Sequence, residues 1–273
     1  MPTRVPKPED FDDLSSSLKF ALTYPEVPET TTAILIIFHG LGDSEAAFTT
    51  FAKSINLPGV LAISVRGVSP LPPALLGLPD SAAPVNHFHW GDDLTLSPST
   101  GDLDPDPGYT KAVDLVLGKL IRETLISKCG WDTRDMLLFG FGQGGSLALG
   151  LASKLRGPLS ERITNVTNAE PAAAAAAAEG ENTAFKGVVS IGGPLPASTI
   201  PTLSAREKAR SPALVCHGRA SEALDDDALE VLRKEFVDVR DVKWQKPDDG
   251  MPGSREEMLP IMKFFAERLA NEF

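Results

Sequence analysis

The stretch Met136-Leu-Leu-Phe-Gly-Phe-Gly-Gln-Gly-Gly145 decides the predicted fold. Its first four residues form a continuous apolar run, which is typical of a parallel β-strand buried on both faces. The glycines that follow permit a sharp turn, and an apolar helical pattern continues through Leu155. A strand that turns directly into a helix is the repeating unit of α/β proteins.

Similar strand and helix patterns lie on both sides of this stretch. Ala33–Phe38 predicts a central strand, and Val60–Val65 predicts the next one. Further strands are expected at 185–191, 213–216 and 239–244, and helices at 46–55, 112–125, 226–236 and 256–270. The alternation predicts a single α/β domain over residues 1–273, with a mostly parallel sheet and helices on both faces.

Two segments do not fit this alternation. Residues 67–108 are rich in Pro, Gly, Ser and Asp, which predicts a long loop or a flap over the site. Residues 157–184 contain an alanine tract without a packing face, so we expect a low-complexity surface insert with no role in chemistry.

Composition narrows the class of protein. The chain has 273 residues and a formal net charge of −11, which argues against a nucleic-acid partner because such proteins need clustered Lys and Arg. Cys129 and Cys216 lie in apolar surroundings, as is typical of reduced, buried thiols. Neither a signal core nor a membrane-spanning stretch is evident, so we expect a cytoplasmic protein without a transmembrane segment.

The turn at Gly140–Gly144 has the form of a nucleophile elbow, in which a strand enters a helix through Gly-x-Ser-x-Gly. Small flanking residues allow the turn, and the central residue takes a strained backbone conformation. Here the central residue is Gly142, which tolerates that conformation but offers no hydroxyl.

Four motifs together resemble the phospholipase/carboxylesterase family, which includes the acyl-protein thioesterases. They are His39-Gly-Leu-Gly-Asp43, Gly140-Phe-Gly-Gln-Gly-Gly145, Cys216-His-Gly218 and Gly250-Met251. The resemblance implies an α/β-hydrolase fold running from the first strand to the C-terminal helix.

The same resemblance assigns the positions of a catalytic triad. The family's serine, aspartate and histidine fall on Gly142, Ser221 and Gly253, so nucleophile, orienting acid and general base are all replaced. The backbone amides of Leu41 and Gln143 match the family's oxyanion-hole donors. Trp90 matches a tryptophan in the loop beside the active site, which implies a pocket-lining residue.

Loss of the triad has a large energetic consequence. Its members act as a unit, and removing the nucleophile or the base costs on the order of a millionfold in turnover. Other groups offer weak substitutes: the Ser146 hydroxyl is expected to point along its helix, Glu222 has no histidine to orient, and His217 follows a buried strand.

A metal site is the rival interpretation. His87 and His89 are two residues apart on an extended segment and so point the same way, with Asp92 and Asp93 nearby. The spacing matches no known metallohydrolase signature, and a pocket-lining or surface role is favoured. We therefore predict no metal and no cofactor.

Two functional hypotheses follow. In the first, the protein is a catalytically inactive relative of the esterases that binds an acyl or lipid-like ligand or a protein partner. In the second, it is an active ester or thioester hydrolase with non-standard catalytic residues. The triple replacement at Gly142, Ser221 and Gly253 favours the first hypothesis.

Overall fold

A sheet of seven strands organises the computed structural model, which describes residues 3–76, 79, 86–95, 103–104, 106–156, 183–200 and 207–270. The strands are β1 (Phe20–Thr23), β2 (Ala33–Phe38), β3 (Val60–Val65), β6 (Met136–Phe141), β7 (Gly187–Ile191), β8 (Ala213–His217) and β9 (Val239–Lys243). Their spatial order is β1-β3-β2-β6-β7-β8-β9. All neighbouring pairs are parallel except β1 with β3, so the predicted mostly parallel sheet is confirmed.

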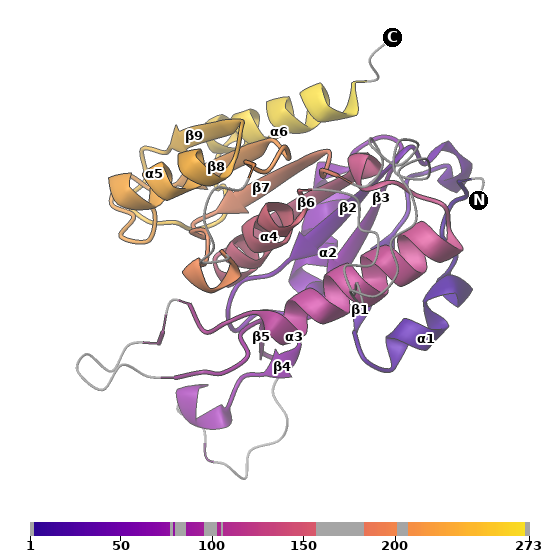
Figure 1. Ribbon diagram of the computed structural model, residues 1–273, viewed down its shortest axis with the longest axis horizontal. Helices are drawn as coiled ribbons and strands as arrows, with labels where there is room; N and C mark the ends of the chain where they lie inside the picture. Colours follow the sequence, from indigo (N-terminus) through magenta and orange to yellow (C-terminus); the bar gives the residue numbers. More distant parts are fainter. Residues whose placement is uncertain are drawn as a thin grey trace, which may run out of the picture.

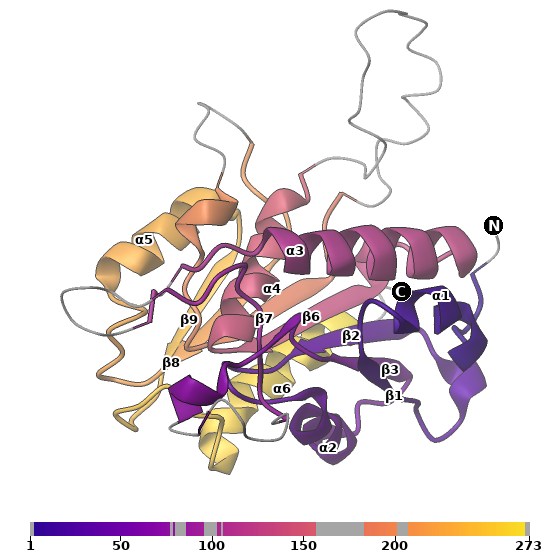
Figure 2. The same ribbon diagram turned by 90° about the horizontal axis from the view of Figure 1, so that it is seen from below.

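Helices cover both faces of the sheet, as predicted (Figures 1 and 2). One face carries α2 (Glu45–Ile55) and α6 (Arg255–Leu269). The opposite face carries α3 (Thr110–Val113), α4 (Gln143–Lys154) and α5 (Asp226–Glu235). Short helices lie at Pro8–Phe11, Asp12–Ser15 (α1), Pro28–Thr30, Pro73–Leu76, Thr133–Asp135 and Ala197–Thr199.

The core consists of two apolar layers separated by the sheet. Along β2, Ile34 and Ile36 face the layer beneath α4, while Leu35 and Ile37 face the layer beneath α2 and α6. Every residue of β2 is buried, which explains why its sequence is apolar throughout rather than alternating.

The helix predicted over residues 112–125 has a different form. After α3 the chain continues as a π-helix, η4 (Asp114–Lys128), rather than as an α-helix. Hydroxyls bond five residues back, from Thr124 Oγ1 to the Lys119 carbonyl at 3.0 Å and from Ser127 Oγ to the Arg122 carbonyl at 2.8 Å. The buried residues of η4 include Val116, Leu120, Ile121 and Leu125. Their spacing fits a π-helix as well as an α-helix, so the apolar pattern predicted the commoner α-helix.

The two irregular segments lie partly outside the described residues. Within the predicted loop 67–108, β4 (Ser69–Pro70) pairs with β5 (Phe88–His89) in a small antiparallel sheet. Residues 77–78, 80–85, 96–102 and 105 of that loop, and 157–182 of the predicted insert, are outside the described part of the chain. The flap and insert therefore remain predictions.

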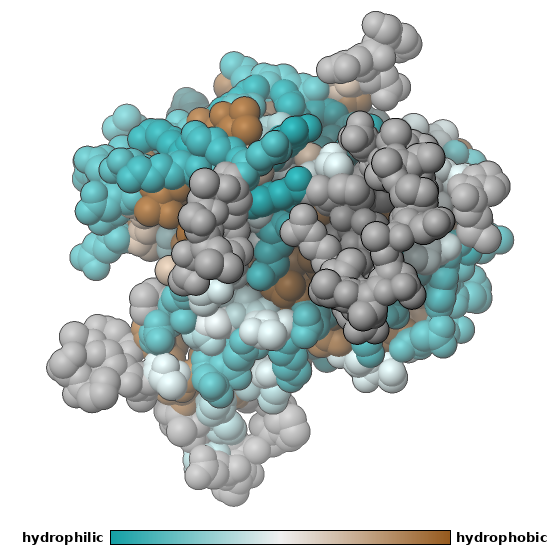
Figure 3. All heavy atoms as spheres, viewed as in Figure 1, coloured by the Kyte–Doolittle hydropathy of each residue, from teal (hydrophilic) through white to brown (hydrophobic). Residues whose placement is uncertain are grey.

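Cys129 and Cys216 are both buried and free. On the face shown in Figure 3, hydrophilic side chains dominate around α5 and β9, and apolar atoms form small separate patches. Within the described ranges, no helix combines the length and apolarity that crossing a membrane requires.

Candidate active site

The turn between β6 and α4 has the geometry expected of a nucleophile elbow. Gly142 adopts φ 51° and ψ −120°, and its amide donates to the Ile191 carbonyl at 2.8 Å. A Cβ added at Gly142 would meet no atom within 4 Å, whereas one at Gly144 would lie 2.4 Å from the His39 carbonyl oxygen. Gly144 therefore permits close packing of α4 on β2, and Gly142 stands at the open apex of the turn without a hydroxyl.

Two backbone amides flank this apex. Leu41 follows β2 and its side chain is exposed, while Gln143 is the first residue of α4. The strands that precede them are neighbours in register, with Phe38 opposite Gly140. Neither amide donates a hydrogen bond to another described residue. The Gln143 amide carries partial positive charge because it is the first of α4, and the Leu41 amide from the neighbouring loop is a second donor, so the pair suits a carbonyl or carboxylate oxygen.

Trp90 contacts the loop that follows β2 and carries Leu41. Its side chain is fully buried, its Nε1 donates to the His39 carbonyl at 2.8 Å, and its ring packs edge-on against Phe38. Its backbone amide donates to Gln143 Oε1 at 2.8 Å. The tryptophan thus connects the loop after β2 to the start of α4 and fixes the relative position of the two candidate donors.

The positions assigned to the acid and the base lie in the loops after β8 and β9. Ser221 Oγ donates to Asp249 Oδ2 at 2.7 Å, and the Gly218 amide donates to Asp249 Oδ1 at 2.8 Å. Gly253 donates its amide to Glu257 Oε2 at 2.7 Å. A serine–carboxylate bond therefore connects these loops where the family resemblance places an aspartate–histidine pair.

Asp249 is the site residue that the sequence analysis missed. It precedes the Gly250-Met251 motif directly, so its position was the available signal. Its contact with Ser221 joins residues 28 apart in the chain, and loop spacing did not predict that contact.

The four histidines occupy other places. Burial lowers the pKa of His39, whose Nδ1 bonds the Gly40 carbonyl while its Nε2 accepts from the Gly67 amide at 2.7 Å. His217 bonds Asp241 Oδ1 at 2.9 Å, and His87 Nδ1 bonds the Gly42 carbonyl. Burial also lowers the pKa of His89. None of these imidazoles is hydrogen-bonded to a residue at the three triad positions.

The alternative groups have other places in the fold. Asp92, from the rival metal motif, accepts the amides of Thr110 and Lys111 and so caps α3. No group of three or more His, Cys, Asp or Glu in the described part of the chain could hold a metal ion. Ser146 is buried at the end of the first turn of α4, and its amide donates to the Gly142 carbonyl at 3.0 Å.

Comparison with known proteins agrees with the motifs. The sequence profile of the phospholipase/carboxylesterase family matches residues 21–171, more than half of the chain. The chain belongs to this family. The matched range includes Leu41, Trp90, Gly142 and Gln143, but ends before Ser221 and Gly253.

Two curated relatives are named hydrolases. An uncharacterized hydrolase of Schizosaccharomyces pombe is 31% identical over 125 residues, which cover 45% of this chain and 46% of the relative. A second, from Mycosarcoma maydis, is 31% identical over 119 residues, covering 42% of this chain and 40% of the relative. The aligned stretch spans less than half the length of either relative.

Solved structures share the fold over nearly the whole chain. Zea mays acyl-protein thioesterase 2 has a TM-score of 0.60 at 21% identity, covering 92% of this chain and 99% of that one. Esterase PE8 has a TM-score of 0.60 at 17% identity, covering 93% and 100%. These similarities establish the α/β-hydrolase fold of this family member.

Proposed function

We propose that this member of the phospholipase/carboxylesterase family is a catalytically inactive protein that binds an acyl or lipid-like ligand through the amides of Leu41 and Gln143. The observation that carries the proposal is Gly142, which holds the apex of the elbow at positive φ with open space and no hydroxyl. A triad hydrolase needs a nucleophile at this apex.

The loops around the apex support the same proposal. Asp249 already accepts from Ser221 and Gly218, so its carboxylate serves to join two loops. The loop at Gly253 bonds Glu257 and contributes no side-chain base. What the site retains is the pair of amides that donate to no described residue, and such donors bind an oxygen without needing a triad.

Binding at these amides is tested by titrating the ¹⁵N-labelled protein with butanoate. We expect the amide signals of Leu41 and Gln143 to shift most, because a carboxylate accepts from both. Shifts confined to other regions of the protein, with these two signals unmoved, would contradict the ligand-binding half of the proposal.

The wild-type protein is expected to show no turnover above buffer with p-nitrophenyl butanoate or with an acyl thioester. Hydrolysis that disappears on Ser146→Ala or His89→Ala would instead favour an active enzyme with non-standard residues. A colorimetric assay with these two variants as matched comparisons separates the outcomes.

Restoring activity should require four substitutions, not three. Ser221→Asp alone would place a second carboxylate beside Asp249, and like charges at hydrogen-bond distance repel. The test variant carries Gly142→Ser, Ser221→Asp, Asp249→Ser and Gly253→His, and its control carries Gly142→Ala in place of Gly142→Ser. We expect the turnover rate of the test variant to exceed that of the control by about 10²-fold, because general acid–base assistance contributes ~10²–10⁴. Equal rates for the serine and alanine versions would mean that the loops no longer support a triad.

A further inference from the structure

The peptide between Gly40 and Leu41 carries one of the two candidate donors, because its N–H is the Leu41 amide. Its carbonyl has two hydrogen-bond partners, His39 Nδ1 at 2.7 Å and the Asp43 amide at 3.2 Å. A trans peptide directs its C=O and its N–H to opposite sides, and no peptide bond of the described residues is cis. A group that fixes the Gly40 carbonyl therefore also fixes the direction of the Leu41 N–H.

The partners of the His39 ring determine which nitrogen carries the proton. Nε2 lies 2.7 Å from the Gly67 amide, which can only donate, so Nε2 has to accept. Burial lowers the pKa of His39, which favours the neutral ring with a single proton. That proton is therefore on Nδ1, and the ring donates it to the Gly40 carbonyl.

Aromatic rings pack against the His39 side chain, which is fully buried. The ring centroid of His39 lies 5.1 Å from that of Trp90 and 6.5 Å from that of Phe48. Trp90 Nε1 also donates to the His39 carbonyl at 2.8 Å. The shorter of the two hydrogen bonds to the Gly40 carbonyl thus comes from a side chain with little room to turn.

The Gly40–Leu41 peptide lies beside the apex of the elbow. A Cβ added at Gly40 would lie 2.7 Å from Cδ1 of Phe141, the residue that precedes Gly142. Gly42 takes φ 78°, the left-handed conformation that the third residue of a type II turn requires. The turn over residues 40–43 keeps the peptide next to the apex, and the ring of His39 holds its carbonyl.

We propose that His39 is a positioning residue, which holds the Leu41 amide in the direction needed to donate to a ligand oxygen. It contacts no ligand and acts through the Gly40 carbonyl. The inference rests on the function proposed above, in which the Leu41 amide binds such an oxygen.

Two substitutions each preserve one of the two ring contacts. The side-chain amide of asparagine reaches the position of Nδ1 and can still donate to the Gly40 carbonyl. The side-chain oxygen of glutamine reaches the position of Nε2 and can still accept from the Gly67 amide. His39→Asn and His39→Gln each lose one buried hydrogen bond, so their melting temperatures should fall by similar amounts.

Residual dipolar couplings of the ¹⁵N-labelled protein report the direction of the Leu41 N–H without any ligand. We expect the Leu41 coupling to match the wild type in His39→Asn and to shrink in His39→Gln, because the released peptide averages over several directions. The Gln143 coupling should stay constant in both variants, since α4 holds that amide. An unchanged Leu41 coupling in His39→Gln would overturn the proposal, because the Asp43 bond would then suffice.

Butanoate affinity is the second measurement. His39→Asn should bind butanoate as tightly as the wild type, and His39→Gln about tenfold more weakly, because one hydrogen bond to the carboxylate is lost. A merely structural histidine would give equal affinities for the two variants, since they lose similar stability.

His217→Gln is the matched control. His217 ends β8, and its Nδ1 bonds the carbonyl of the following glycine, Gly218, at 2.9 Å, just as His39 Nδ1 bonds the Gly40 carbonyl. This variant should leave both the Leu41 coupling and the butanoate affinity unchanged. A loss of either would mean that the effect does not come from the Gly40–Leu41 peptide, and the proposal would fail.

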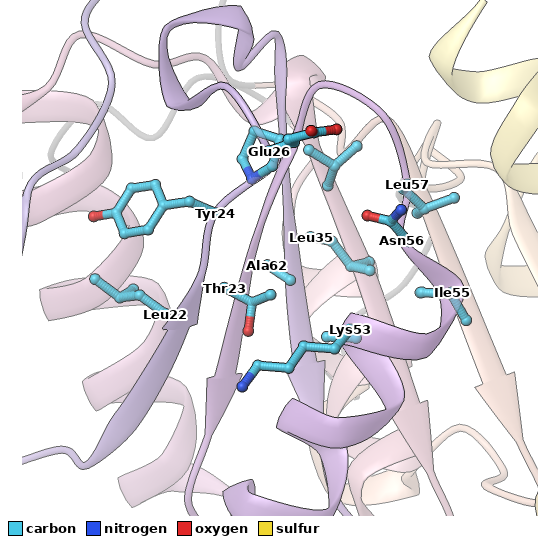
Figure 4. Close-up of a pocket in the computed structure, with 13 residues that line it drawn as sticks. Leu22, Thr23, Tyr24, Glu26, Leu35, Lys53, Ile55, Asn56, Leu57 and Ala62 are labelled. Carbon is cyan, nitrogen blue, oxygen red and sulfur yellow. The ribbon is translucent and has the colours of Figure 1, made fainter.

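A failure of the proposed function would give a different result. Butanoate that entered only the cavity of about 500 Å³ between β1 and the end of α2 (Figure 4) would shift Leu57 and Ala62, which line it. The signals of Leu41 and Gln143 would then stay unmoved. The couplings measured without ligand would still decide whether His39 fixes the Leu41 N–H.

Discussion

Gly144→Ala is expected to lower the free energy of unfolding by about 3 kcal/mol, the upper range for overpacking a well-filled interior. The added Cβ would lie 2.4 Å from the His39 carbonyl oxygen and 2.5 Å from that of Phe38. Both are backbone atoms at the end of β2, so relief requires α4 to move away from the sheet. Urea denaturation followed by circular dichroism measures the change.

Gly142→Ala is the matched control for this prediction. It adds the same methyl group two residues away, where no atom lies within 4 Å, so its cost comes only from the positive φ of 51°. We expect a loss of about 1 kcal/mol. If the two variants were equally destabilised, backbone strain rather than packing would dominate the energetics of the turn.

Glu235→Ala should produce the second large loss, about 3–5 kcal/mol, because it breaks a buried ion pair by removing one partner. Glu235 binds the guanidinium of Arg156 and the hydroxyl of Ser153, joining the ends of α4 and α5. The side chains of Arg156 and Glu235 are only 15% and 10% exposed. The guanidinium also donates to the carbonyls of Ser153 and Glu207, but these neutral acceptors do not balance its charge, which stays largely shielded from water when the carboxylate is removed.

Glu230→Ala provides the comparison on the same helix. Glu230 pairs with Lys234 at 2.8 Å, and their side chains are 61% and 72% exposed. Surface pairs of this spacing contribute about 0.3–0.5 kcal/mol, so the variant should unfold almost as the wild type does. A similar small loss for Glu235→Ala would show that Arg156 finds adequate solvation without its partner.

Much of the fold could be predicted because its strands are buried on both faces. The predicted bounds of β2 and β3 match the structure to the residue, since continuous apolar runs flanked by turn residues leave little ambiguity. The strand β1 was not predicted. It is only four residues long and half-buried, and its place comes from antiparallel pairing with β3, which local pattern does not specify.

The candidate site, like the fold, could be predicted only in part. Gly142, Gln143 and Leu41 adjoin strand ends, so motif and topology together predicted their neighbourhood. The Asp249 carboxylate bonds groups in the loop after β8, and that contact depends on how two long loops fold against each other. Residue spacing does not specify how two loops contact each other. The sequence analysis therefore predicted that the aspartate and histidine are missing, but it did not predict the hydrogen bond between Ser221 and Asp249.

The hydrogen bond between Ser221 and Asp249 has an evolutionary consequence under the proposed function. Because the carboxylate lies on the loop after β9, whereas the family resemblance places it on the loop after β8, a mutation that returned an acid to Ser221 would encounter the acid already present at Asp249. Each single step back would therefore be harmful or neutral and would gain no turnover for selection to act on. The loss of catalysis in this lineage would behave as a ratchet, leaving the protein free to specialise in binding.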